Sequence, residues 1–125
     1  MSAPLFPNYI NGEWVEGPTF DNRNPAHWDE VVGRFVNGAP EDINRAVQAA
    51  QEALPAWASM TAPARGALLF RVADILEKRL DQISAEMTRE EGKTLPEAKG
   101  EVRRSINIFR YFAGEGARLG GIVAP

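Results

Sequence analysis

The sequence has 125 residues, of which 44% are hydrophobic and 25% charged, a composition typical of a globular chain that can bury a core. Its net charge of −3 gives no basic surface for nucleic acid or an anionic membrane. No apolar run reaches the roughly 18 residues that span a bilayer, and the N-terminus lacks signal-peptide character. The absence of cysteine excludes disulfides, zinc–thiolate sites and a cysteine nucleophile within this chain. We therefore expect a cytoplasmic protein with neither a nucleic-acid nor a membrane partner.

The first 38 residues are predicted to be rich in strands. Residues 1–7 contain prolines and are expected to be a loosely ordered lead-in. Asn11 and Gly12 lie between two short apolar runs, which is the strongest local signal for a two-residue type I′ hairpin. Further strands are predicted over 19–23 and 31–36, separated by turn residues at Asn24-Pro25.

Residues 39–119 are predicted to form about four helices. The first is expected to end at Pro55, so that Trp57 falls in a linker and wedges helices together. Thr61 is expected to cap a second helix and Asp81 a third, which ends at Gly92. The apolar positions of the first helix and then the second are Ile43, Ala46, Val47, Ala50 and Leu54, followed by Leu68, Leu69, Val72, Ile75, Leu76 and Leu80.

The fourth helix organises the chain. Thr94 and Glu97 have the spacing of a capping box, and the helix is expected to extend as far as Leu119. One face carries a stripe that must meet a core, made of Val102, Ile106, Phe109 and Ala113. Strands followed by helices, without βαβ alternation, indicate a mixed α/β fold. Residues 120–125 read as the start of an extended segment that lacks a partner strand.

A second face of this helix mixes a small residue, a cation and apolar groups at Gly100, Arg104, Ile108 and Tyr111. Such a mixture is unusual for a face that only meets solvent. It indicates a helix placed between layers of a larger protein or against another subunit.

Two other features could be binding or catalytic sites, a group of glycines and a single histidine, but ordinary structural roles are favoured for both. Gly114, Gly116 and Gly120 follow a helix, whereas a dinucleotide-binding fingerprint precedes one, so helix termination and close packing are favoured over phosphate binding. His27 is the only histidine and lies in a turn, which favours a solvated side chain.

Six motifs, in one order and with natural spacing, resemble the N-terminal part of the NAD(P)-dependent aldehyde dehydrogenases. The resemblance covers residues 8–125, and its most specific pair lies in and around the fourth helix. The motifs are YINGEW, Asn24-Pro25, AVQAAQEALPAW, TAPARGALLFRVADIL, MTREEGKTLPEAKGEV and YFAGEG.

This resemblance implies an enzyme that oxidises an aldehyde, including semialdehydes, to a carboxylate and transfers hydride to NAD or NADP. In the family a cysteine thiolate attacks the aldehyde, a glutamate activates water, and the oxyanion is held by an asparagine amide and a backbone N–H. All these residues, and the motifs that hold the cofactor, come after the point where this sequence ends. We therefore expect an incomplete part of the cofactor-binding domain, with no catalytic or cofactor-binding residue and no activity alone, belonging to a homo-oligomer.

Two weaker roles follow from the resemblance. Positions matching Gly100, Arg104 and Ile108 line the substrate tunnel in similar enzymes. Glu101, with the loop around Asn22, matches a structural monovalent-cation site of some members. Arg103 and Arg104 suggest a substrate with an anionic tail, but adjacent helical residues point about 100° apart, so at most one of them can serve.

Two alternatives remain open at this point. The chain could be a non-catalytic binding or assembly module that keeps the same fold. It could also be a truncated form or the product of an interrupted reading frame.

Overall fold

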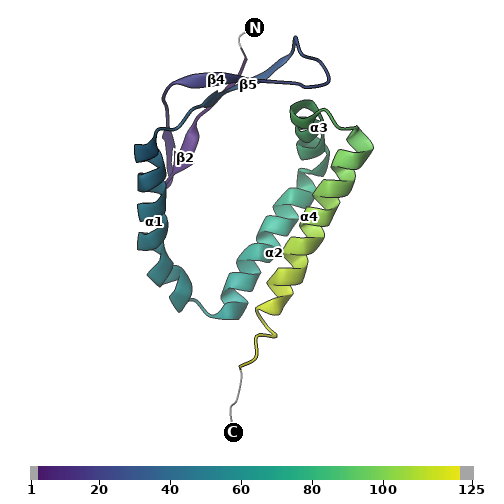
Figure 1. Ribbon diagram of the computed structural model, residues 1–125. Coiled ribbons are helices and arrows are strands. Elements are labelled where there is room, and N and C mark those ends of the chain that lie inside the picture. Colours follow the sequence, from purple (N-terminus) through teal and green to yellow (C-terminus); the bar gives the residue numbers. More distant parts are fainter. Residues whose placement is uncertain (1–2, 122–125) are drawn as a thin grey trace. The chain divides into compact units, whose positions relative to one another are not determined.

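The computed structural model describes residues 3–121. Within them five short strands precede four helices, which confirms the mixed α/β class (Figure 1). The chain divides into two compact units. The first runs to Ala56 and also takes in Glu86–Lys93, whereas the second contains Trp57–Ala85 and resumes at Thr94. None of the helices in the described part is both long and apolar enough to span a membrane.

In the first unit, a three-stranded sheet has the order β1-β5-β4. The central strand β5 (Val31–Val36) pairs in parallel with β1 (Leu5–Phe6) and antiparallel with β4 (Thr19–Arg23). The prediction of a loose lead-in over residues 1–7 is therefore wrong at β1. No local pattern marks a two-residue strand whose partner lies far along the chain. Its fit depends on Gly33, where a Cβ atom would lie 2.4 Å from the Phe6 ring.

A separate hairpin joins β2 (Asn8–Ile10) to β3 (Glu13–Val15) in antiparallel register. Both turn residues have positive φ, 52° at Asn11 and 84° at Gly12, which confirms the predicted type I′ turn. The rings of Tyr9 and Trp14 lie opposite each other with centroids 4.7 Å apart. Such cross-strand aromatic pairs stabilise a hairpin and fix its register.

Helix α1 (Pro40–Ser59) continues through Pro55, so the predicted end of this helix is wrong and Trp57 is helical. The proline removes one hydrogen-bond donor, but the alanines around it favour helix on both sides. None of its residues is buried, and the predicted apolar stripe is open to solvent at Ile43, Val47 and Leu54.

In the second unit, α2 (Ala62–Lys78) packs against α4 (Leu95–Glu115), as Figure 1 shows. The start of α2 meets the end of α4, so the two helices are antiparallel. The predicted core stripe of α4 is confirmed: Phe109 is half-buried, and the buried residues are Ala98, Val102, Ile106 and Ala113. The predicted apolar face of α2 is less deeply buried, because the residues of α2 that are buried are the small Gly66 and Ala73.

Helix α3 (Leu80–Glu91) begins one residue before Asp81, which therefore lies in the first turn and is not the cap. Gly92 has a φ of 73° after the last turn, which confirms the predicted stop. The capping box at the start of α4 is also confirmed, because Glu97 accepts the N–H of Thr94 at 3.0 Å and its hydroxyl at 2.7 Å. Helix α4 ends at Glu115, earlier than predicted, and residues 122–125 of the predicted extended segment lie outside the described residues.

Candidate functional site

A hollow of about 510 Å³ lies on the exposed face of α4, opposite its core stripe. It contains all three of the tunnel residues predicted from the sequence, Gly100, Arg104 and Ile108. We call it the α4 hollow, and it is lined by Gly100, Arg103, Arg104, Asn107, Ile108, Tyr111 and Phe112.

Helical spacing builds this hollow. Gly100, Arg104, Ile108 and Phe112 follow each other at intervals of four, which places them along one side of the helix. The sequence analysis continued this face to Tyr111, which also lines the hollow, but missed Phe112, although the interval of four leads to it. The rings of Tyr111 and Phe112 meet edge to face with centroids 5.3 Å apart.

The α4 hollow is mainly apolar, yet it is open. The side chains of Ile108, Tyr111 and Phe112 are all exposed. A Cβ atom on Gly100 would meet nothing within 4 Å, so there is free space at the N-terminal end of the hollow. An exposed apolar patch of this kind marks a surface that binds a ligand or another part of a protein.

The two arginines of the α4 hollow differ in their surroundings. Asp81 has a lowered pKa, first because Lys99 hydrogen-bonds it at 2.8 Å and also because the charge of Arg103 is near. Neither Arg103 nor Arg104 has an ion pair or a hydrogen bond from its guanidinium within residues 3–121. Farther along the helix, Arg110 binds Glu77 and Asp74, which raises its pKa. Both arginines of the α4 hollow are thus cations without a bonded partner in the described fold, and Arg103 lies nearer to an acidic group.

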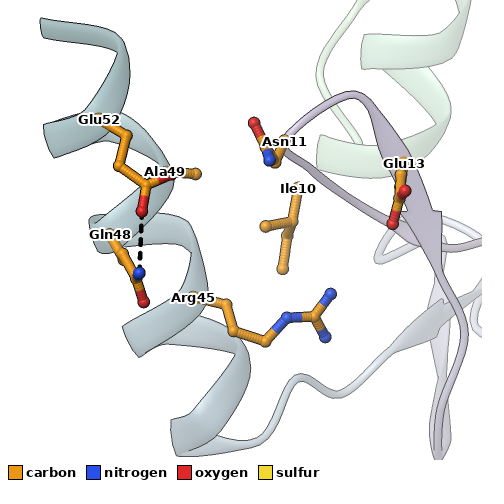
Figure 2. A pocket seen from close by; sticks show the side chains of 7 residues that line it. All are labelled: Ile10, Asn11, Glu13, Arg45, Gln48, Ala49 and Glu52. Atoms are coloured by element: carbon orange, nitrogen blue, oxygen red, sulfur yellow. Dashed lines mark hydrogen bonds between the residues drawn. The ribbon is translucent and has the colours of Figure 1, made fainter.

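A second hollow, of about 210 Å³, lies between the β2–β3 hairpin and α1 (Figure 2). It is polar, and several of its groups already have partners. Gln48 donates to Glu52 at 2.8 Å, and Arg45 pairs with Asp42 at 3.4 Å. The remaining lining residues are Ile10, Asn11, Glu13 and Ala49. Most of these residues belong to two of the motifs that carry the family resemblance, YINGEW and AVQAAQEALPAW, but the sequence did not predict a site here.

Of the two predicted cation ligands, Asn22 is half-buried in β4 and its amide donates to Glu90 at 3.1 Å. Glu101 belongs to the other unit, so its pairing with Asn22 stays a prediction. Among the residues described, acidic and histidine side chains do not gather in groups of three or more that could hold a metal ion. His27 is exposed in its loop.

A polar network joins that loop to the end of α3. Glu30 accepts hydrogen bonds from Asn24 at 2.7 Å and from Arg89 at 2.8 Å. These two bonds, in that order, lower the pKa of Glu30. The network holds the loop in place and offers no free catalytic group.

The glycines near the end of α4 have a packing role. A Cβ atom on Gly116 would lie 2.5 Å from the carbonyl oxygen of Ala62, and one on Gly66 would lie 2.4 Å from that of Ala113. Both glycines are needed for the close approach of α2 and α4, and close packing at Gly116 is confirmed.

Comparison with known proteins then gives the family. A sequence profile of the aldehyde dehydrogenase family matches residues 14–125. The chain belongs to the aldehyde dehydrogenase family. It spans about a quarter of the length of the curated relatives that it matches.

Two curated relatives are semialdehyde dehydrogenases. The alpha-ketoglutaric semialdehyde dehydrogenase of Bacillus subtilis is 52% identical over 94% of this chain and 25% of its own length. The alpha-ketoglutarate semialdehyde dehydrogenase of Haloferax volcanii is 43% identical over 91% of this chain and 24% of its own. A crystal structure of a betaine aldehyde dehydrogenase mutant from Staphylococcus aureus, in complex with NAD⁺, is 35% identical with a TM-score of 0.88 and covers 95% of this chain and 25% of that one.

Two glycines of this aldehyde dehydrogenase chain, Gly66 and Gly116, do not fit the phosphates of a dinucleotide. A phosphate cradle needs glycine backbone at the start of a helix. Here Gly66 and Gly116 are occupied by helix packing, as their close backbone neighbours show. We therefore derive no chemical step through NAD or NADP from these residues.

Proposed function

We propose that this chain is part of an NAD(P)-dependent dehydrogenase that oxidises a semialdehyde to a dicarboxylate. The observation that carries the proposal is the α4 hollow, an open apolar surface with an available guanidinium. The semialdehyde dehydrogenases of Bacillus subtilis and Haloferax volcanii support the substrate class. The NAD⁺ complex of the Staphylococcus aureus enzyme supports the choice of a nicotinamide cofactor.

In this proposal Gly100, Arg104 and Ile108 form one wall of the substrate tunnel. An apolar wall orients the carbon chain of the substrate and excludes water from the reacting aldehyde. The chain has no cysteine, so the thiol nucleophile is supplied by the rest of a longer protein. A homo-oligomer in the cytoplasm is part of the same proposal.

A hybrid enzyme tests this proposal. The 121 matching residues of the Bacillus subtilis enzyme would be replaced by the aligned residues of this chain. We expect the hybrid to fold cooperatively by circular dichroism and to reduce NAD⁺ or NADP⁺ with a semialdehyde, as measured by cofactor absorbance. A folded hybrid without turnover would contradict the proposal. Light scattering of the same protein tests the homo-oligomer.

The isolated chain is the complementary measurement. We expect it to show no reduction of NAD⁺ with simple aldehydes, because it contains no thiolate. Turnover by the purified chain would overturn this part of the proposal.

The alternative is a non-catalytic module of the same fold. Such a module must cover its own apolar surface, whereas Ile43, Val47 and Leu54 of α1 are exposed. A sharp, cooperative thermal transition of a monomeric chain would favour the alternative. A broad transition or self-association would favour part of a larger enzyme.

A further inference from the structure

The hollow of about 210 Å³ between the β2–β3 hairpin and α1, which we call the hairpin hollow, has no part in the function proposed above. Ile10 and Glu13 are direct partners in the hairpin register, so their side chains lie on the same face. The residues of α1 that line the hollow recur at intervals of three and four, which places them on one side of the helix. They are Arg45, Gln48, Ala49 and Glu52.

The hairpin hollow carries opposite charges at its two ends. Arg45 and Glu52 are seven residues apart, which is about 10 Å along the helix axis. Figure 2 shows the guanidinium of Arg45 on one side of Ile10 and the amide of Asn11 on the other. We call the part lined by Asn11, Glu13 and Glu52 the acidic end. Ile10 is buried, so the middle of the hollow has an apolar floor.

The guanidinium of Arg45 is held only weakly by its own chain. It contacts Asp42 at 3.4 Å, which is longer than the usual range of about 2.7–3.2 Å. The other carboxylate oxygen of Asp42 accepts the N–H of Ala39 at 2.9 Å, so this side chain already serves the start of α1. An exposed ion pair of this kind contributes little to stability. A second carboxylate can therefore bind Arg45 without breaking a strong interaction.

The acidic end has acceptors to spare. Glu13 has neither an ion pair nor a hydrogen bond in the described part of the chain. Glu52 uses its Oε1 atom to accept from Gln48 at 2.8 Å, which leaves Oε2 for another donor. The side-chain carbonyl of Asn11 is a further acceptor. An ammonium group has three N–H donors and no acceptor, so it matches this end of the hollow.

The volume and the charges together define the class of molecule. Water occupies about 30 Å³ in the liquid, so a hollow of about 210 Å³ has room for about seven non-hydrogen atoms. A lone anion would leave the acidic end unmatched, and a lone cation would leave the guanidinium unmatched. A short aliphatic chain with an ammonium at one end and a carboxylate at the other matches both ends and the apolar floor.

We propose that the hairpin hollow binds a small linear amino acid whose two charged groups lie at opposite ends of its chain. The carboxylate binds Arg45, whose planar fork can donate two parallel hydrogen bonds. The ammonium lies at the acidic end, and the methylene groups contact Ile10 and Ala49. These side chains bind the molecule and carry out no chemical step on it. The α4 hollow takes no part.

The test is an NMR titration of the isotope-labelled 125-residue chain with 4-aminobutanoate, which has seven non-hydrogen atoms. We expect saturable shifts of the amides around Asn11 and Arg45 with a Kd of about 1 mM, because a molecule this small gains little from an open site. Butanoate and butylamine each keep one charge on the same carbon chain and should bind at least about tenfold more weakly. Glycine, whose charges are adjacent, should also bind more weakly.

Substitutions identify the two ends. Arg45→Gln should weaken binding of 4-aminobutanoate about tenfold and leave that of butylamine unchanged. The double substitution Glu13→Gln and Glu52→Gln should do the reverse, with a similar loss for 4-aminobutanoate and none for butanoate. Glutamine keeps the length of the glutamates and favours helix, so these exposed substitutions should not disturb folding. Arg104→Gln is the matched control, because it removes an arginine of the α4 hollow and should leave the Kd within about twofold.

A second measurement uses the hybrid enzyme, in which the rest of a dehydrogenase supports the fold. Millimolar 4-aminobutanoate should raise its midpoint of thermal unfolding, and Arg45→Gln should reduce that rise. Shifts that do not saturate, or equal binding of 4-aminobutanoate, butanoate and butylamine, would overturn the proposal. A loss caused by Arg104→Gln in place of Arg45→Gln would also overturn it, because the molecule would then lie in the α4 hollow. The selective losses described above would support it.

Discussion

Helices α1 and α4 have nearly the same length, 20 and 21 residues, and each carries an apolar stripe, yet their environments differ. Helix α4 packs on α2 and contains four buried residues, three of them in its stripe, whereas α1 has none. The difference shows that helical periodicity predicts which face avoids water but does not identify what covers it. In the longer enzyme proposed above, which the coverage of about a quarter of the relatives' length supports, other residues would cover the α1 stripe.

The largest expected difference in stability is between two isoleucine-to-alanine substitutions, one on each helix. Ile106 of α4 is 3% exposed, so Ile106→Ala should lower the free energy of unfolding by about 2–5 kcal/mol through a lost contact and a cavity. Ile43 of α1 is 64% exposed, and Ile43→Ala should change it by no more than about 0.5 kcal/mol. Urea unfolding of the chain, followed by circular dichroism, measures both. Equal losses would contradict the difference between the helices.

The same α1 variant has a second use in the hybrid enzyme. If the rest of the protein covers α1, Ile43→Ala should destabilise the hybrid more than it destabilises the isolated chain. Thermal unfolding of the hybrid with and without the substitution measures this. A hybrid as insensitive as the chain would show that the α1 stripe stays exposed.

A smaller effect is expected from two helical glycines with opposite surroundings. Gly66→Ala places a Cβ atom 2.4 Å from the carbonyl oxygen of Ala113, so α2 and α4 must separate and stability should fall by about 1–3 kcal/mol. Gly100→Ala is the matched control, because open space surrounds that position. It should stabilise α4 by up to about 1 kcal/mol through helix propensity. Urea unfolding of the two variants in parallel checks the opposite signs.

The threonines that cap α4 and α2 should differ by about 1 kcal/mol or less in what they contribute to stability. Thr94 takes part in the capping box of α4, and Thr94→Ala should cost about 1 kcal/mol. Thr61 caps α2 without a side-chain hydrogen bond to the helix, so Thr61→Ala should cost only a few tenths of a kcal/mol. The midpoint of thermal unfolding of each variant is the measurement. A larger loss from Thr61→Ala would contradict the assignment of the box.

The smallest effect concerns pH and the loop network of the first unit. The lowered pKa of Glu30 means that its carboxylate stabilises the fold at neutral pH. This contribution is complete above the ordinary glutamate pKa of about 4.3 and is lost as pH falls through the lower folded value. Arg89→Gln should therefore raise the pKa of Glu30, as followed by carbon NMR of its carboxyl group. An unchanged titration would show that Asn24 alone sets this pKa.

Local chemistry in the sequence was sufficient for many of the elements. The positive φ angles at Asn11 and Gly12, the stop at Gly92 and the box at Thr94 were all predicted, because each depends on a few neighbouring residues. The same holds for the core stripe of α4, which follows from a 3.6-residue period. Three residues of the α4 hollow were predicted from the family resemblance.

Other features depend on residues that are distant in sequence, and the tertiary structure alone revealed them. Strand β1 exists because β5 provides its hydrogen bonds and Gly33 leaves room for Phe6. The ion pair of Lys99 with Asp81, and the nearness of Arg103 to the same carboxylate, exist because the first turn of α3 lies beside α4. Spacing along the chain determines which face of a helix is apolar. Packing between distant segments decides whether that face is buried or left open, because each contact requires a partner that no local pattern encodes.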